Sequence, residues 1–431
     1  MRRAANSLPR ERSPDSTLAL ARDPYRFIAK RCEHHGADAF ATRILLQRTI
    51  CMRGRDAAAL FYDQDRFRRE GAMPRAIVKT LLGRGGVQGL DGVAHRHRKQ
   101  MFMAMMTPDR ISALRGRFIE SWRAAAQQWQ STNQPVVLYD AMHEILTRAV
   151  CGWAGVPLAE HEVAQRTREL TALFDHAGNI GPRHFGARIA RRHADRWMAD
   201  FVHNVRTERI TPPAEDTAAH HIIFHRDRSG DLLSPQIAAV EVLNILRPVV
   251  AVSVYITFVA LALHEYPSCR RELESDQQEE YASQFVQEVR RFYPFFPAVA
   301  AKVRHDFHWR GYHFPKGRRV LLDLHGTNHD PRLWKDPKTF RPERFGGRAA
   351  LEEQDAFAPI PQGGGDHHVN HRCPGEWITL DLMKGAARFL ASQLNYEVPE
   401  QDLQVDETRL PALPKSRFIM RNVRLKSEQS P

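Results

Sequence analysis

The chain has 431 residues, with 63 Lys and Arg against 50 Asp and Glu and a formal net charge of +13. A content of 42% hydrophobic and 26% charged residues is that of a globular protein and excludes a disordered or fibrous one. Five cysteines are too few for a disulfide-dense secreted scaffold, so we expect a reducing, cytoplasmic location.

The first 19 residues are polar and basic, and they predict a disordered tail before a single domain over residues 20–431. Helical periodicity then predicts helices over 24–35, 54–63, 91–106, 108–129, 138–153, 159–175, 185–209, 234–265, 267–274, 279–293 and 374–394. Short strands are predicted between these helices, at 40–46, 49–52, 298–303, 307–309, 313–314 and 320–324. The sequence therefore predicts a mainly α fold with a small β lobe built from distant segments.

One run, residues 249–263, is strongly apolar but shorter than the ~20 residues that cross a bilayer. We predict a buried core helix there and no membrane span. The positive charge is partly explained by residues 183–209, where a helix would bury one apolar stripe of Ile189, Trp197, Phe201 and Val205. Its other face would be a solvated basic surface formed by Arg188, Arg191, Arg192 and Arg196. No base-reading element or aromatic interleaving accompanies this charge, so we predict no nucleic-acid partner.

Three short motifs near the C-terminus carry chemistry. Glu288 and Arg291 are three residues apart in a predicted helix and can pair on one face. The run Phe340-Arg-Pro-Glu-Arg-Phe345 contains Arg344. Cys373 precedes Pro374-Gly375 at the start of an amphipathic helix, where free N–H groups and the helix dipole favour a thiolate. Gly375 has no Cβ, so a bulky group can approach the backbone there.

Taken in this order, the motifs resemble those of the cytochrome P-450 superfamily. The resemblance implies a triangular helical fold with a small β lobe and a haem b cofactor. Cys373 would be the axial thiolate ligand of the iron, and Glu288, Arg291 and Arg344 would form a structural ion network. The other four cysteines are predicted to be buried core residues: Cys32, Cys51, Cys151 and Cys269.

The departures from the superfamily pattern indicate function. Asp366 and Val369 stand where the family loop has Phe and Gly, and Leu246-Arg247-Pro248-Val249 replaces the Gly and acid–alcohol pair of its central helix. Pro248 removes a backbone hydrogen bond and would open space beside the haem. Arg247 would place a guanidinium against an apolar pocket, which is costly without a partner. Either a protein carboxylate pairs with it, or a ligand carboxylate held bidentately completes the site.

A carboxylate with a long apolar tail is a fatty acid, and beside the iron it could shuttle the proton of hydrogen peroxide. The Arg–Pro pair, the GGGDHxxxHRC loop and the segment GGVQGLDGVAHRHRKQMF are similar to the bacterial fatty-acid peroxygenases of the superfamily. This resemblance implies a haem-thiolate peroxygenase that hydroxylates long-chain fatty acids near the carboxyl group, at the α and/or β position. Its partners would be the fatty acid and hydrogen peroxide, without a redox partner.

The same resemblance assigns further roles. His95 and Lys99, one helical turn apart, would bind a haem propionate. Gln88 matches a distal-pocket position and favours hydroxylation, and Leu82 stands where relatives often have an aromatic residue that contacts substrate. The predicted catalytic residues are thus Arg247, Pro248 and Gln88. Three alternatives remain: a dioxygen-dependent monooxygenase fed by redox partners, a peroxide-driven decarboxylase, and a haem carrier or sensor.

Overall fold

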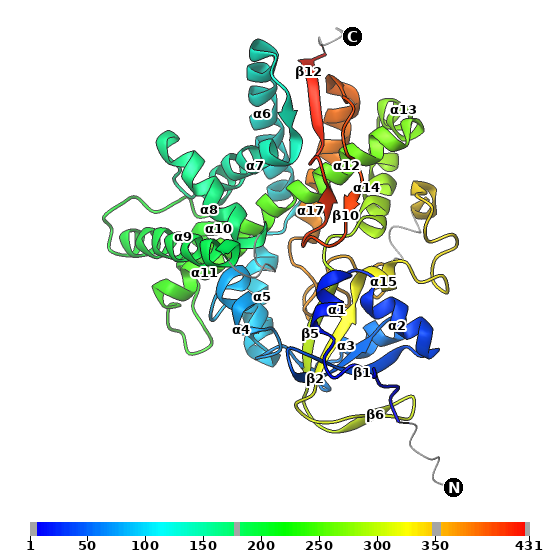
Figure 1. Ribbon diagram of the computed structural model, residues 1–431. Helices are drawn as coiled ribbons and strands as arrows, with labels where there is room; N and C mark the ends of the chain where they lie inside the picture. The colour runs from blue at the N-terminus through cyan, green and yellow to red at the C-terminus, as the bar shows by residue number, and fades with distance from the viewer. Residues whose placement is uncertain (1–6, 176–181, 347–354, 427–431) are drawn as a thin grey trace.

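The structure is a computed structural model that describes residues 7–175, 182–346 and 355–426 (Figure 1). Helices dominate it. The helices are α1 (Thr17–Arg22), α2 (Phe27–His35), α3 (Arg55–Phe61), α4 (Arg75–Ile77), α5 (Gly92–Ala104), α6 (Pro108–Thr132), α7 (Leu138–Ala154), α8 (Val163–Asp175), α9 (Pro182–Arg206), α10 (Ala218–Ile223), α11 (Pro235–Ala251), α12 (Ser253–Glu265), α13 (Pro267–Ser275), α14 (Glu280–Phe292), α15 (Leu324–Asn328) and α17 (Glu376–Arg388). The mainly α fold class is confirmed.

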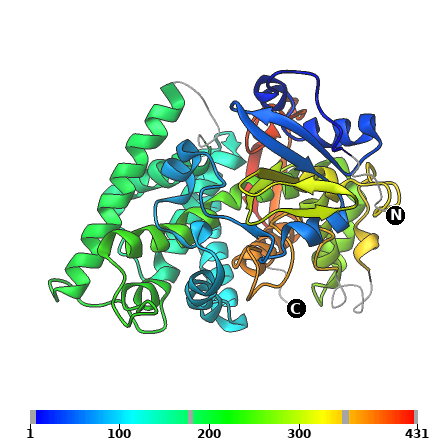
Figure 2. The ribbon, with the colours of Figure 1, turned by 90° about the horizontal axis from the view of Figure 1, so that it is seen from below.

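Short strands form the β-rich part. They are β1 (Ala39–Ile44), β2 (Gln47–Met52), β3 (Phe67–Arg68), β4 (Val136–Val137), β5 (Ala298–Val303), β6 (Phe307–Trp309), β7 (Tyr312–Phe314), β8 (Arg319–Asp323), β9 (Leu394–Glu397), β10 (Val405–Asp406), β11 (Leu413–Pro414) and β12 (Ile419–Leu425). The largest sheet has the order β1-β2-β8-β5-β3, with β2 and β8 parallel. Figure 2 shows its early, blue strands beside the later, yellow ones, so segments far apart in sequence form the predicted β lobe.

Alternation along β2 explains why both faces of this sheet are buried. Ile50 and Met52 pack into a cluster with Phe61, Phe67 and other residues on one face. Cys51, between them in sequence, points to the opposite face, where it packs with residues of α2 and β1. The sheet is thereby fixed between two apolar layers.

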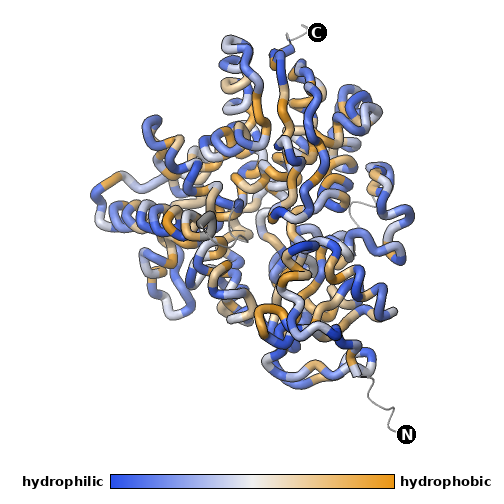
Figure 3. The backbone as a smooth tube through the Cα atoms, viewed as in Figure 1, coloured by the Kyte–Doolittle hydropathy of each residue, from blue (hydrophilic) through white to orange (hydrophobic). Residues whose placement is uncertain are grey.

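The central helices α11 and α12 are buried in the helical part. The stretch Pro235–Glu265 is long and apolar enough to cross a bilayer, but 94% of its most apolar window is buried inside the protein. Figure 3 shows the same stretch as part of the hydrophobic interior. The predicted core helix is therefore confirmed, with one change: it divides at Val252, whose N–H donates to the carbonyl of Val249 at 3.1 Å. The break lies one turn after Pro248, which cannot donate a helical hydrogen bond.

The structure corrects the predicted N-terminal tail. Residues 1–6 of it lie outside the described residues, but the rest is ordered against β1. The N–H of Ala41 donates to the carbonyl of Pro9 at 2.7 Å, and the N–H of Glu11 donates to the carbonyl of Ala41 at 3.0 Å. The helix α1 then begins at Thr17. Backbone pairing with a distant strand leaves no signal in the local composition, so the tail prediction was wrong for residues 7–19.

The apolar stripe predicted on α9 is also partly wrong. Phe201 and Val205 are buried, but Ile189 is 37% exposed. Arg191, predicted on the solvated face, is 2% exposed and donates through Nε to Asp195 at 2.7 Å. The buried face of α9 is therefore rotated toward Arg191, because the helix packs against both α8 and α11.

The predicted ion network ties α14 to the turn Pro342–Phe345. Glu288 is fully buried, and its carboxylate accepts hydrogen bonds from Arg291 Nε at 2.7 Å and Arg344 Nε at 3.1 Å. It also accepts from the backbone N–H of Arg341 at 2.8 Å. The structure thus brings together all three residues that the sequence selected.

We expect Glu288→Ala to destabilise the protein by about 3–5 kcal/mol, because two buried guanidinium groups lose their counter-charge. The free energy of unfolding measured in urea checks this. Glu144→Ala is the matched control, since Glu144 forms an exposed i, i+4 pair with Arg148 at 2.8 Å and such pairs contribute ~0–1 kcal/mol. Equal losses in the two variants would contradict a structural role for the buried network. If Glu288→Ala does not fold, Glu288→Gln should show a smaller loss in the same assay.

Candidate active site

One cavity of about 310 Å³ brings the predicted site residues together. The selected residues that line it are Cys373, Arg247, Pro248, Gln88, Leu82, His95 and Lys99. The rest of the wall is largely apolar and includes Leu81, Val87, Phe102, Phe174, Ile245, Val249, Phe295, Val299 and Ile378. The thiol of Cys373 and the guanidinium of Arg247 therefore lie in the same largely apolar cavity.

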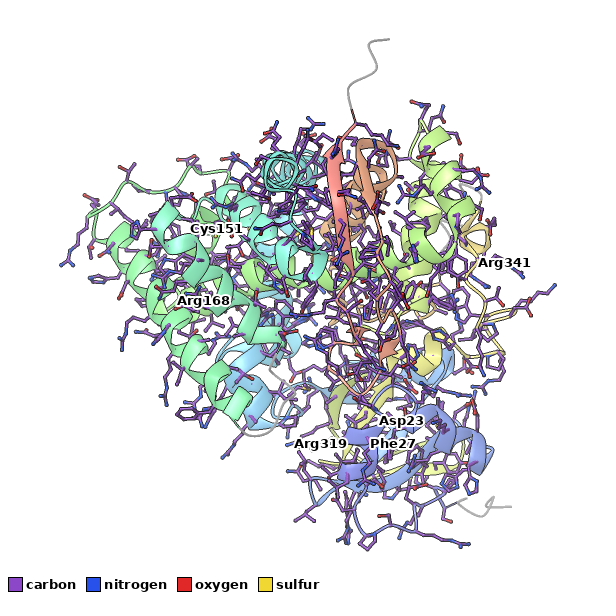
Figure 4. The ribbon with its side chains drawn as sticks, turned by 45° about the horizontal axis from the view of Figure 1, so that its top comes forward. Asp23, Phe27, Cys151, Arg168, Arg319 and Arg341 are labelled. Atoms are coloured by element: carbon purple, nitrogen blue, oxygen red, sulfur yellow. The ribbon has the colours of Figure 1, made fainter. Side chains whose placement is uncertain are left out.

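Cys373 is the only one of the five cysteines, all within the described residues, that lines this cavity. The other four are buried elsewhere, as Figure 4 shows for Cys151 among the helices of α7 and its neighbours. The backbone N–H of Cys373 donates to the carbonyl of Gln362 at 3.1 Å. The Gln362 side-chain amide lies 3.8 Å from the Cys373 sulfur and also donates to Thr379 Oγ1 at 3.1 Å. Sequence reasoning missed Gln362 because its approach to the sulfur depends on the loop conformation.

The environment of the thiol differs from the sequence expectation. Burial raises the pKa of Cys373, and the Glu376 carboxylate raises it further. The Gly375 N–H, Lys99 and Arg290 act in the opposite direction but do not prevail. The helix start alone therefore does not favour a thiolate in the protein. A coordinated metal ion deprotonates a thiol outright, so the raised pKa is consistent with a thiol that ionises on binding iron.

A buried cluster of charged side chains holds the loop that carries Cys373. Glu376, at the start of α17, accepts hydrogen bonds from Arg372 Nε at 2.7 Å and pairs with Arg290. His367 Nε2 lies 3.0 Å from the same carboxylate. These partners hold the pKa of Glu376 well below its usual value despite burial, which acts the other way. The loop that carries the thiol is thereby anchored to α14 and α17.

The residues around the cavity fit the haem that the motifs imply. A Cβ on Gly375 would have only the Cys373 sulfur, at 4.0 Å, within contact range, so the space above this glycine is open. His95 is buried, its Nδ1 has no hydrogen-bond partner, and its ring stacks on His371 with centroids 3.7 Å apart. Lys99 donates to the carbonyls of Asn370 and Arg372, the latter at 2.6 Å. An ammonium has three donors, so Lys99 keeps one N–H for a haem propionate. His95 keeps its unpaired Nδ1 for the same group.

Arg247 is buried without a counter-ion. Its side chain is 6% exposed, lines the cavity, and forms no ion pair with any residue in the described parts of the chain. Its Nη1 has no hydrogen-bond partner. Burial, followed by the positive charge of Arg191, lowers the pKa of Arg247 to about 9. Of the two readings left open by the sequence, pairing with a protein carboxylate does not occur among the described residues.

A buried polar chain positions Gln88 at the cavity. Its Oε1 accepts a hydrogen bond from Asn244 Nδ2 at 3.2 Å. Asn244 also donates to Glu241 at 2.9 Å, and Glu241 accepts from Arg98 at 2.8 Å. Sequence reasoning missed Asn244 and Glu241, although Asn244 lies three residues before Arg247 and so shares its helix face.

Comparison with known proteins agrees with these features. The cytochrome P-450 family profile matches residues 270–410. A cytochrome P-450 of Synechocystis sp. (strain ATCC 27184 / PCC 6803 / Kazusa) is 23% identical over 409 residues, which cover 89% of each chain.

Solved structures give closer likenesses. Cytochrome P450SP alpha (CYP152B1) in complex with (R)-ibuprophen is 56% identical, with a TM-score of 0.92 over 96% of this chain and 100% of that one. Cytochrome P450EX alpha (CYP152N1) with myristic acid is 42% identical, with a TM-score of 0.93 over 98% of this chain and 100% of that one. A variant of cytochrome P450 OleT in complex with arachidonic acid is 32% identical, with a TM-score of 0.93 over 99% and 100% of the chains. The chain therefore belongs to the cytochrome P-450 family, within its CYP152 group, and is a haem-thiolate oxidoreductase whose cofactor is a cysteine-ligated haem b.

Proposed function

We propose that the protein uses hydrogen peroxide to hydroxylate long-chain fatty acids at the α and/or β carbon. The observation that carries the proposal is the buried guanidinium of Arg247, which has no carboxylate partner among the described residues and shares an apolar cavity with Cys373. An acid head group with an oily tail is the ligand that satisfies both parts of this space. Cys373 is the proposed axial ligand of the haem.

Arg247 binds the substrate in this proposal. A guanidinium grips a carboxylate through two parallel N–H donors, and Nη1 of Arg247 is without a partner. The apolar wall, including Leu82 and Phe102, receives the alkyl chain and excludes water. Binding of the substrate carboxylate by Arg247 places the first carbons of the alkyl chain next to the carboxyl group in the reactive part of the cavity. Reaction near the carboxyl group follows from this position.

The bound carboxylate also serves as the acid–base group. When bound, haem supplies the oxidising chemistry of the site. The helix α11 continues from Pro248 into Val249, Val250 and Ala251, so it offers no acid or alcohol of its own at this position. Arg247 therefore holds the substrate carboxylate where it can accept a proton from hydrogen peroxide and return it to the oxygen that leaves as water. Gln88, fixed by Asn244, lines the same space.

The similar solved structures agree with a carboxylate ligand. Those structures contain myristic acid, arachidonic acid and (R)-ibuprophen. All three molecules are carboxylic acids with an apolar body. This shared chemistry supports a fatty acid as the substrate of the present protein.

Incubating the haem-loaded protein with myristic acid and hydrogen peroxide, without reductase or nicotinamide cofactor, tests the proposal. We expect 2- and/or 3-hydroxymyristic acid by mass spectrometry. Methyl myristate is the matched control, and loss of the carboxylate should slow turnover by about 10²–10⁴-fold. Turnover only with dioxygen and a reducing system would instead show a conventional monooxygenase. A terminal alkene one carbon shorter would show a decarboxylase, and no product under either condition would indicate a carrier or sensor.

A further inference from the structure

A second hollow, of about 430 Å³, shares no lining residue with the Cys373 cavity. It is formed by the segment after α4, by α9 and by the first turns of α11, which lie side by side in Figure 1. Five cationic side chains line it: Lys79, Arg84, Arg188, Arg191 and Arg192. Among the described residues, Asp195 is the only carboxylate in its lining. The described lining therefore carries four more positive than negative charges.

Arg191 distinguishes this hollow from an ordinary basic surface. Its side chain is 3% exposed, and Nε donates to Asp195 at 2.7 Å. Its Nη1 lies 3.4 Å from the carbonyl of Thr80, and its Nη2 has no hydrogen-bond partner. Burial lowers the pKa of Arg191, against the effect of Asp195. A buried guanidinium with an unused donor is costly, and a further anion would relieve that cost.

Because Gly83 has no side chain, the guanidinium of Arg191 can approach the main chain that lines the hollow. Gly83 has a φ of +81°, and a Cβ there would lie 2.2 Å from Arg191 Nη2 and 2.6 Å from Val240. Any other residue would therefore displace the side chain of Arg191. The hollow therefore combines the main chain at Gly83, which has no side chain, with the buried guanidinium of Arg191. The exposed side chains of Arg84 and Arg192 lie beside them.

We propose that this hollow binds a phosphate group. A dianion with three strong acceptor oxygens matches a cluster of arginines better than a single carboxylate does, because guanidinium donors pair bidentately with phosphate oxygens. The phosphate belongs either to a free phosphate or phosphate ester or to the head group of a lipid. The proposal goes beyond fatty-acid oxidation and does not depend on it.

The position of the hollow gives the bound anion a consequence. Leu81 and Leu82 line the Cys373 cavity, while Lys79, Gly83 and Arg84 of the same segment line the hollow. A phosphate held by Arg84 and Arg191 would clamp this segment against α9. It would also reduce the positive charge of Arg191 felt by Arg247. Phosphate binding is thus placed to stiffen one wall of the cavity.

Calorimetric titration of the haem-loaded protein with inorganic phosphate, at constant ionic strength set with sodium chloride, measures the binding directly. The variant Arg188→Gln/Arg192→Gln removes two hollow charges from exposed or half-buried positions of α9. We expect its affinity for phosphate to fall at least about tenfold. The matched control is Arg196→Gln/Arg209→Gln, which removes two exposed charges outside the hollow and should keep the affinity of the parent protein.

A second arm distinguishes the sources of the phosphate. Flotation with phosphatidylcholine vesicles, with and without phosphatidic acid, tests the lipid head group with the same three proteins, the parent and the two double variants. Binding to phosphatidic acid vesicles that depends on Arg188 and Arg192, without binding of inorganic phosphate, assigns the hollow to a lipid. No binding in either arm, or equal binding by both double variants, overturns the proposal. None of these results depends on turnover of fatty acid.

Discussion

Arg247→Ala is expected to lower fatty-acid turnover by about 10²–10⁴-fold, the range for losing a positioned acid–base group, while haem stays bound. The side chain is buried and forms no ion pair within the described residues, so truncation breaks no ion pair of the fold. It removes a buried charge that has no counter-ion, so we expect a smaller loss of stability than breaking a buried ion pair would cause. Activity per bound haem, quantified from absorbance, separates loss of catalysis from loss of cofactor.

Two further variants sharpen this result. Arg247→Lys keeps the charge but loses the planar fork, so it should retain some substrate binding with a lower rate. Arg319→Ala is the matched control, because Arg319 is also buried with an unpartnered Nε but lies in the β-rich part, away from the cavity (Figure 4). It should keep the turnover per haem of the parent protein. Full activity in Arg247→Ala would refute the proposal that Arg247 binds the substrate carboxylate.

The parts of the site that sequence could predict are those set by short spacing. Glu288 and Arg291 pair because they are three apart on one helix, and the structure places Arg344 on the same carboxylate. Arg247 could be selected because a charge in an apolar helix is costly without a partner, and the structure places it in the same cavity as Cys373. The long helices could be predicted for the same reason, because their apolar residues recur at helical spacing.

The parts that sequence could not predict depend on contacts between distant segments. Gln88 is held by Asn244, from a helix more than a hundred residues later, through a hydrogen bond of 3.2 Å. Gln362 reaches the sulfur of Cys373 only because the intervening loop folds back. Arg191 is buried although its local pattern placed it on the solvated face, because two other segments close over it. Such pairs have no periodicity, so tertiary packing alone decides them.

Cys373→Ser is expected to abolish the red-shifted Soret band of the ferrous carbon monoxide complex. That band reports a thiolate ligand, and a serine hydroxyl cannot replace the soft, electron-donating sulfur. The loop should keep its shape, because it is held by the Cys373 backbone N–H, which the substitution retains, and by the cluster around Glu376.

Cys151→Ala is the control for loss of a cysteine in itself. Cys151 is buried in α7 and does not line the cavity, so its removal should leave the band in place with a small loss of stability. An unchanged band in Cys373→Ser would mean that another residue ligates the iron. Because the band reports a thiolate, that residue would have to be another cysteine, although none of the other four lines the cavity. The spectrum of this one variant therefore tests the ligand independently of the role of Arg247.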